Sequence, residues 1–274
     1  MDNSRIQNAL IFFLLASMAA CATAYDKRGV YHRLREGEDI WKVARYYHVT
    51  PQELAEWNNI MDPGKDMTPG LKLYIPKSRE KSPLAHKRLP RHEAAKFNAQ
   101  IQFDHTRFIW PVAGSVISPF GIRNGRRHDG IDIKAEEGTP IKAAGSGETV
   151  FSGQLKGYGN LVIIRHKDRF FTVYAHNSKN SVKKGQKVEK GAIIGYVGST
   201  GRATGPHLHF EVREGAKARN PLFLLPASAD RDVAVAKAGK ETNAGGVKKS
   251  DAKTSRFARR EDMIERLEKR RKKR

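Results

Sequence analysis

Residues 109–226 alternate short runs rich in valine and isoleucine with turns that contain glycine. Examples of these turns are Gly145-Ser146-Gly147 and Gly157-Tyr158-Gly159-Asn160. Short β-branched runs bounded by glycine and asparagine are typical of strands joined by tight turns. The pattern therefore predicts a domain built from short β-strands over residues 109–226.

A smaller segment, residues 29–76, has a different pattern. Residues 30–34 alternate like a strand, and a helix is predicted by the i, i+3, i+4, i+7 spacing of Ile40, Val43, Ala44 and Tyr47. Thr50 stands before Pro51 and three residues before Glu53, which is the capping-box start of a second helix. Residues 71–75 form a return strand, so the predicted order is strand, helix, helix, strand.

With the motifs REGEDIWKVARYYHVTPQELAEWNNI and TPGLKLYIP, this segment resembles the LysM module. The resemblance implies a small α+β fold (βααβ) that binds N-acetylglucosamine-containing glycans such as peptidoglycan in a shallow groove between two turns. The positions that map to those turns are Gly37, Glu38, Asp39, Asn59 and Ile60. Trp57 is either a platform for sugar stacking or, as is more frequent for a helical aromatic, a core residue.

Histidine spacing is the strongest chemical signal of the β segment. His128 and Asp132 stand four residues apart across a glycine, whereas His207 and His209 are two apart and share one face of a strand. His176 ends another apolar run. Each motif alone carries little weight, but two histidines and one aspartate together form a typical zinc site that leaves a position for water. Zinc-activated water hydrolyses amides at neutral pH.

The motifs HDGIDI, TVYAH and GPHLHFEVR resemble the M23 (LytM, lysostaphin-type) zinc metallopeptidases over about residues 109–226. The resemblance implies a mostly antiparallel β fold with a substrate groove, and one Zn²⁺ per chain bound by His128, Asp132 and His209. It makes His176 and His207 the unliganded catalytic pair that orients water and transfers protons. Family substrates are peptide bonds of peptidoglycan. Asn177 departs from the family, which usually has an apolar residue there.

Two functions remain open at this stage. The chain is either a peptidoglycan endopeptidase that the LysM module directs to the glycan, or a non-enzymatic LytM-type activator of cell-wall amidases. Degenerate activators typically lose zinc ligands or catalytic histidines, and all five residues are present here. The sequence therefore favours the enzyme.

The N-terminus indicates export. Residues 9–20 are apolar and end in Met18-Ala19-Ala20 before Cys21, the single cysteine of the chain. This resembles a bacterial lipobox, in which residues 1–20 are a signal peptide and Cys21 is lipidated; the alternative is ordinary cleavage after Ala24. One cysteine excludes an intrachain disulfide and a cysteine-rich zinc module. The lipobox implies a lipoprotein of the bacterial envelope, on the periplasmic face of the outer membrane where there are two membranes.

The chain is strongly basic: it contains 51 Lys and Arg and 29 Asp and Glu, which gives a net charge of +22. Residues 77–108 are predicted to be a basic linker, and residues 227–274 a basic tail, partly disordered and partly helical, that ends in RRKKR. The tail either adheres to anionic envelope polymers or is merely solvated. A nucleic-acid partner is not expected, because no recognition motif accompanies the charge.

Overall fold

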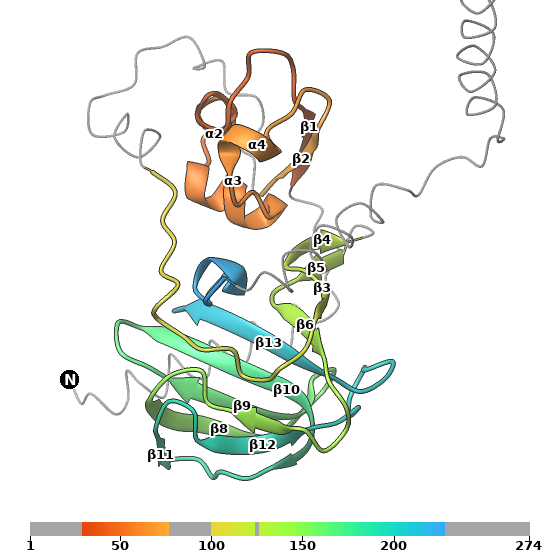
Figure 1. The fold of residues 1–274 in the computed structure, drawn as a ribbon, viewed down its shortest axis with the longest axis vertical. Helices are drawn as coiled ribbons and strands as arrows, with labels where there is room; N and C mark the ends of the chain where they lie inside the picture. Colours follow the sequence, from red (N-terminus) through yellow and green to blue (C-terminus); the bar gives the residue numbers. More distant parts are fainter. Residues whose placement is uncertain (1–28, 77–99, 124–125, 228–274) are drawn as a thin grey trace, which may run out of the picture. The chain divides into compact units, whose positions relative to one another are not determined.

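The computed structural model describes residues 29–76, 100–123 and 126–227 (Figure 1). Cys21, most of the predicted linker and nearly all of the basic tail lie outside these residues, so what the sequence indicates for them stays a prediction. Among the described residues, no helix is long and apolar enough to cross a lipid bilayer.

Residues 29–76 form a two-stranded antiparallel sheet with helices between its strands. The elements in chain order are β1 (Val30–Arg33), α2 (Ile40–Tyr47), α3 (Pro51–Asn58), α4 (Pro63–Asp66) and β2 (Lys72–Ile75). Helix α3 begins with the predicted capping box, in which Thr50 Oγ1 accepts from the Glu53 N–H at 3.1 Å and Glu53 Oε2 accepts from the Thr50 N–H at 3.3 Å. The predicted strand, helix, helix, strand order is confirmed.

Helix α4 is an addition to that prediction, because the sequence indicated only a turn at Asp62-Pro63-Gly64. Asp62 accepts a hydrogen bond from the Gly64 N–H at 3.0 Å, and Asp66 Oδ2 accepts from the Met61 and Asp62 N–H groups at 2.9 Å. These two carboxylates satisfy the backbone donors at the start of a single helical turn.

The second domain is a sheet of ten strands with a separate two-stranded ribbon, β4 (Gly121–Arg123) and β5 (Arg126–His128). The main path runs β11-β8-β9-β10-β13-β6-β3, and all its pairs are antiparallel. The bounds are β3 (Val116–Ser118), β6 (Ile131–Lys134), β7 (Pro140–Lys142), β8 (Gly147–Leu155), β9 (Gly159–Arg165), β10 (Phe170–Asn180), β11 (Lys187–Val188), β12 (Ile193–Val197), β13 (His207–Glu214) and β14 (Lys217–Arg219), followed by the 3-10 helix η2 (Pro221–Phe223). The mostly antiparallel β architecture is confirmed.

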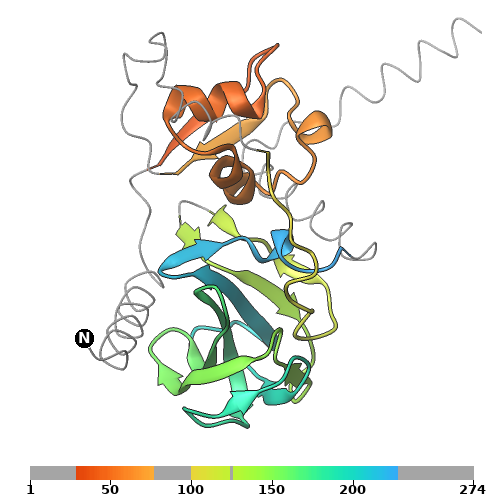
Figure 2. The same cartoon turned by 90° about the vertical axis from the view of Figure 1, so that its left-hand side faces the viewer.

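Both faces of the sheet are covered at its centre. On β9, Val162 and Ile164 join one apolar cluster, whereas Leu161 and Ile163 join another on the opposite face. Strands β9, β10 and β13 lie side by side in both views of the ribbon (Figures 1 and 2). A polar side chain on these strands is therefore shielded from water unless the covering layer opens above it.

Candidate metal centre

Strand β13 has two chemically different faces. Leu208, Phe210 and Val212 point into the apolar core. The alternate positions carry a row of polar but buried side chains: His207, His209, Glu211 and Arg213. Burying such groups costs free energy unless each finds a partner, so the partners of this row define the site.

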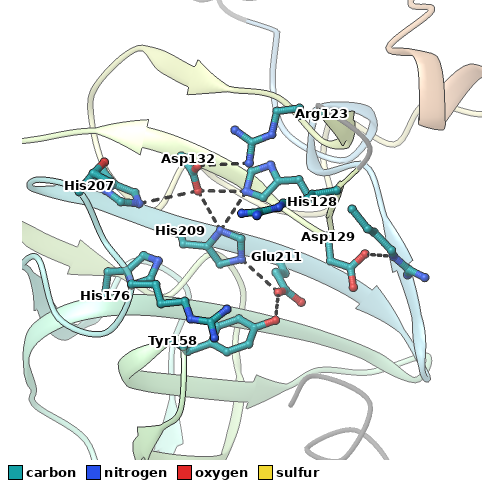
Figure 3. A pocket seen from close by; sticks show the side chains of 14 residues that line it. Arg123, His128, Asp129, Asp132, Tyr158, His176, His207, His209 and Glu211 are labelled. Carbon is teal, nitrogen blue, oxygen red and sulfur yellow. Dashed lines mark hydrogen bonds and ion pairs between the residues drawn. The ribbon is translucent and has the colours of Figure 1, made fainter. Parts of the chain in front are cut away.

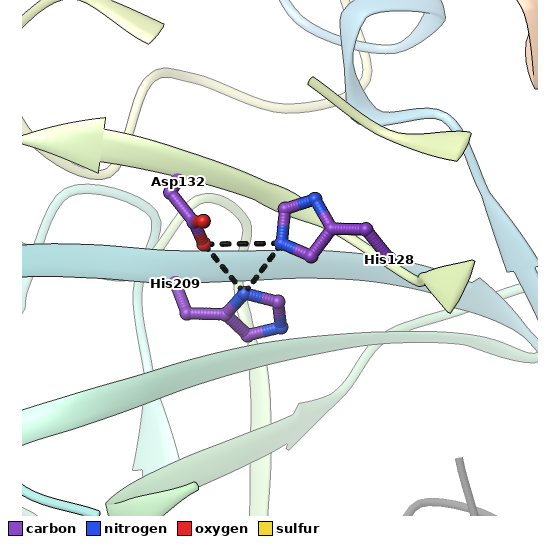
Figure 4. Close-up of side chains that lie close together, drawn as sticks. All are labelled: His128, Asp132 and His209. Carbon is purple, nitrogen blue, oxygen red and sulfur yellow. Dashed lines mark hydrogen bonds and ion pairs between the residues drawn. The ribbon is translucent and has the colours of Figure 1, made fainter. Parts of the chain in front are cut away.

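His128 and Asp132 meet His209 of this row (Figure 4). His209 Nδ1 lies 2.8 Å from Asp132 Oδ1 and 3.2 Å from His128 Nε2, which is itself 3.1 Å from Asp132 Oδ1. The register of β6 against β13 places Asp132 opposite His209, although the two are 77 positions apart. The structure thus brings together the three residues that the sequence predicted as ligands, as a group able to hold a metal ion.

The two remaining histidines line the same pocket (Figure 3). His207 begins β13 and His176 comes from β10, and their ring centroids are 4.8 Å apart. His207 Nε2 lies 3.9 Å from Asp132 Oδ1. All five residues singled out from the sequence therefore meet in one pocket.

Each of the four histidines is oriented by a hydrogen bond on its outer side. The contacts are His128 Nδ1 to Pro119 O at 2.7 Å, His176 Nδ1 to Thr200 O at 2.7 Å, His207 Nδ1 to Gly205 O at 2.8 Å, and His209 Nε2 to Glu211 Oε1 at 3.1 Å. A carbonyl oxygen only accepts, so the ring nitrogen that faces it carries the proton. In His128, His176 and His207 the other nitrogen then has its lone pair available, and His209 Nδ1 offers one once its hydrogen is lost. Together with the Asp132 carboxylate, these nitrogens fit a zinc ion.

His176 has an unusual backbone. Its φ is +65°, in the left-handed region, and the pairing of β10 with β9 shifts register between Tyr174 and Asn177. The His176 N–H donates to Tyr158 O at 2.9 Å, which holds the residue at this irregularity. The distortion directs the imidazole toward the pocket instead of continuing the regular alternation of the strand.

Comparison with known proteins agrees with this geometry. The profile of Peptidase family M23 matches residues 126–221, and that of the LysM domain matches residues 32–76. The Escherichia coli protein named uncharacterized lipoprotein YgeR is 34% identical over 213 residues, covering 74% of this chain and 84% of the relative. The chain belongs to peptidase family M23 and carries a LysM domain.

Two further relatives match over the M23 domain. The DD-carboxypeptidase/endopeptidase Mpg of Neisseria meningitidis is 41% identical over 148 residues, which cover 52% of this chain and 33% of Mpg. The murein hydrolase activator NlpD of Escherichia coli is 44% identical over 118 residues, which cover 43% of this chain and 31% of NlpD. The chain therefore matches only about a third of the length of these two relatives.

Next to the candidate metal ligands His128, Asp132 and His209 (the ligand set) lies a buried polar network that the sequence did not predict. Glu211 Oε1 faces His209 Nε2 and also accepts from Tyr158 Oη at 2.7 Å, while Glu211 Oε2 accepts from Arg213 Nη1 at 2.8 Å. Arg213 is also 3.5 Å from Asp129 Oδ2. The signal was present in HLHFEVR: Glu211 and Arg213 continue the period of two set by His207 and His209.

Replacing Glu211 with glutamine is expected to weaken zinc binding by roughly 10- to 100-fold, the usual effect of losing an outer partner of a metal-binding histidine. Glutamine has nearly the same shape but no charge, so it holds the His209 N–H less strongly. Zinc affinity measured by competition with a chelator checks this. The matched control is Glu148→Gln, which removes a carboxylate paired with Arg165 on β8 and β9 and should leave the affinity unchanged.

Charges around the ligands shift their pKa values in opposite directions. Burial alone would raise the pKa of Asp132, but its close contacts with the His128 and His209 rings hold it well below its usual value. Burial alone would lower the pKa of His209, yet Asp132 and Glu211 outweigh it and raise the pKa to about 10. In the metal-free protein at neutral pH, His209 is therefore a buried cation between two carboxylates.

Zinc binding is expected to release a proton, because His209 Nδ1 must lose its hydrogen before it can coordinate the metal. His209 is protonated below its raised pKa, so the apparent zinc affinity should rise with pH between 7 and 9, by roughly tenfold per unit for one displaced proton. Calorimetry in buffers of different ionisation enthalpy counts that proton directly. A binding heat that is independent of the buffer would contradict the prediction.

Several LysM residues predicted to contact glycan stabilise the turns in which they lie. Glu38 Oε2 lies 2.8 Å from both His32 Nε2 and the Arg35 N–H, and Asp39 caps α2 through the Lys42 N–H at 2.7 Å. Gly37 (φ +75°) and Asn59 (φ +54°) adopt left-handed backbone. Ile60 is 2% exposed, and the half-buried Trp57 packs against Tyr74 with ring centroids 5.8 Å apart. The side chains of Glu38, Asp39 and Ile60 are therefore committed to the LysM fold itself, and their predicted glycan contacts stay a prediction.

Proposed function

We propose that this chain is a zinc-dependent endopeptidase that hydrolyses peptide cross-links of peptidoglycan. The observation that carries the proposal is the convergence of His128, Asp132 and His209 with His176 and His207 in one pocket. The imidazoles of His128, His176 and His207 each face a backbone carbonyl through Nδ1, which leaves Nε2 for the proposed role. Membership of the M23 family supports the same reaction class.

The mechanism assigns different tasks to the two groups of residues. His128, Asp132 and His209 would hold the zinc, which acts as a Lewis acid on the scissile carbonyl and lowers the pKa of water at the site. In the metal-free protein, burial and the neighbouring His209 charge lower the pKa of His176 to about 4. Burial remains when zinc is bound, so the ring stays neutral near pH 7 and can accept a proton at Nε2. His207, fixed through Nδ1, presents Nε2 on the same side to orient water and return the proton to the leaving amine.

The LysM domain would contribute through location and not through chemistry. Binding to the glycan strands raises the local concentration of the peptidase domain at its peptide substrate, even where the affinity of one module is low. The proposed partners of the chain are therefore the glycan and the stem peptides of the same polymer.

Export and lipidation are part of the proposal. The Escherichia coli relative bears the name lipoprotein, and the present chain has Cys21 after an apolar segment and small residues. We infer a lipoprotein of the bacterial envelope anchored to the membrane through Cys21, with the basic tail available to anionic envelope polymers.

A second candidate function is activation of cell-wall amidases without catalysis. It is favoured by the match to NlpD, whose name is murein hydrolase activator. The complete set of metal and catalytic residues supports the peptidase instead, because an activator has no need of oriented imidazoles around three ligand atoms.

Digestion of purified peptidoglycan separates the two functions. The zinc-loaded chain without residues 1–24 is incubated with cross-linked peptidoglycan, and the released fragments are identified by mass spectrometry. New amine and carboxyl ends at a cross-link, absent after chelation and absent with His209→Ala, would support the peptidase. Release of fragments only when a purified amidase is added, equally with wild type and His209→Ala, would support the activator and refute the peptidase.

A further inference from the structure

The pocket around the ligand set has an arginine-rich wall. Four arginines line it: Arg123, Arg126, Arg127 and Arg202. The acidic residues of the same pocket are already engaged, since Asp132 belongs to the ligand set, Glu211 is held by Arg213 and Tyr158, and Asp129 is paired with Arg127. Arg127 and Asp129 offset each other, and the other three arginines give the wall a positive charge that favours an anionic group.

Arg123 lies beside the candidate metal ligand Asp132. It ends β4, and its Nη2 lies 3.9 Å from Asp132 Oδ2, a long ion pair (Figure 3). Within the part of the chain that the structure describes, its guanidinium makes no closer polar contact. Its side chain is 35% exposed, so it is neither fully solvated nor fully paired.

Partial burial without a close partner is an uncommon state for a guanidinium. The group has five N–H donors in a rigid fork that matches a carboxylate. A ligand carboxylate would satisfy donors that the described residues leave unused beside the candidate metal ligands.

We propose that Arg123 binds the free α-carboxylate of the substrate residue on the amine side of the scissile bond. In that residue only the α-carbon separates the scissile nitrogen from the carboxylate, so the two groups must lie close together. Arg123 contacts the ligand Asp132 and is therefore within reach of this position. The inference rests on the proposed function for the place of the scissile bond, but the binding itself does not require hydrolysis.

This subsite selects a class of peptidoglycan bond. A terminal peptide bond, or a cross-link to a diamino acid that keeps its own carboxylate, presents the required anion. An interior bond of a bridge peptide does not, because the carboxyl group of its amine-side residue is already an amide. The arginine wall thus favours carboxylate-bearing junctions over the interior of a bridge.

Binding can be measured without turnover. The probes are N-acetyl-L-Lys-D-Ala-D-Ala and its C-terminal carboxamide, titrated by calorimetry into the zinc-loaded His207→Ala chain. We expect the carboxylate peptide to bind about 10- to 100-fold more tightly, as for a hydrogen-bonded charge pair. Adding Arg123→Gln should remove that preference and leave carboxamide binding unchanged. Arg165→Gln, which removes the same charge away from the pocket, should keep the preference.

The outcomes distinguish this subsite from the proposed function. Equal binding of the two peptides by the His207→Ala chain, no detectable binding of either, or equal weakening of both by Arg123→Gln would overturn the subsite. The carboxylate preference would stand on its own if peptidoglycan digestion showed no cleavage, in which case only the peptidase proposal falls. Zinc content is measured for every variant, and a loss of zinc in Arg123→Gln would assign the residue to metal binding and refute the subsite.

Discussion

Replacing His209 with alanine is expected to abolish zinc binding and peptidoglycan hydrolysis together. The substitution removes one of three ligand atoms that lie within 4.8 Å of one another, and the loss should exceed the roughly 10- to 100-fold effect of an outer partner. It also leaves the buried Glu211 and the partly buried Asp132 without the histidine that both contact. Zinc content after dialysis and release of peptidoglycan fragments are the two measurements.

Asp132→Asn provides an independent test of the same site, because it keeps the shape of the side chain and removes its charge. It should lose zinc and activity in parallel with His209→Ala. The matched control is His166→Ala, which removes a histidine bonded to Ser146 O and Thr172 Oγ1 instead of to the ligand set and should retain both. Activity that persists in metal-free His209→Ala would contradict the zinc mechanism.

Replacing His207 with alanine is expected to lower the turnover rate by about 10²- to 10⁴-fold while zinc remains bound, the usual contribution of a general acid–base group. His207 Nε2 lies 3.9 Å from Asp132 Oδ1 and lies outside the group of ligand atoms. The measurements are kcat on a peptidoglycan fragment and zinc stoichiometry on the same sample.

His176→Ala should behave in the same way, and the double variant should lose little more than either single variant, because residues that act as a unit are not additive. His105→Ala, a histidine bonded to Leu225 O, serves as the control that should keep full activity. Loss of zinc from His207→Ala equal to that from His209→Ala would remove the distinction between ligands and catalytic pair.

Short-range spacing predicted the strands, the helices and the separate histidine motifs, whereas the resemblance to the M23 family predicted that the five residues share one site. The capping box at Thr50, the alternation around His207 and His209, and the glycine turns are all local patterns. The prediction that His128 and His209 meet came from the family resemblance. Spacing along the chain does not fix the register of β6 against β13.

The outer residues of the site were harder to predict, for a physical reason. Glu211 and Arg213 look like ordinary solvent-facing charges in a strand, and only the layer that covers β13 makes them buried and obligatorily paired. No local sequence pattern predicts a role for Arg123 either. Its proposed role depends on the 3.9 Å distance between its Nη2 and Asp132 Oδ2, which lie on two different strands.

The left-handed backbone of His176 also affects which substitutions at this position would be favoured during evolution. A non-glycine residue in that conformation costs on the order of 1 kcal/mol or more, and glycine or asparagine would adopt it more easily. A more stable domain is thus one substitution away, and that substitution removes the imidazole to which we assign proton transfer. Selection for folding alone would replace this histidine, so under the proposed function it is kept for its role in the pocket.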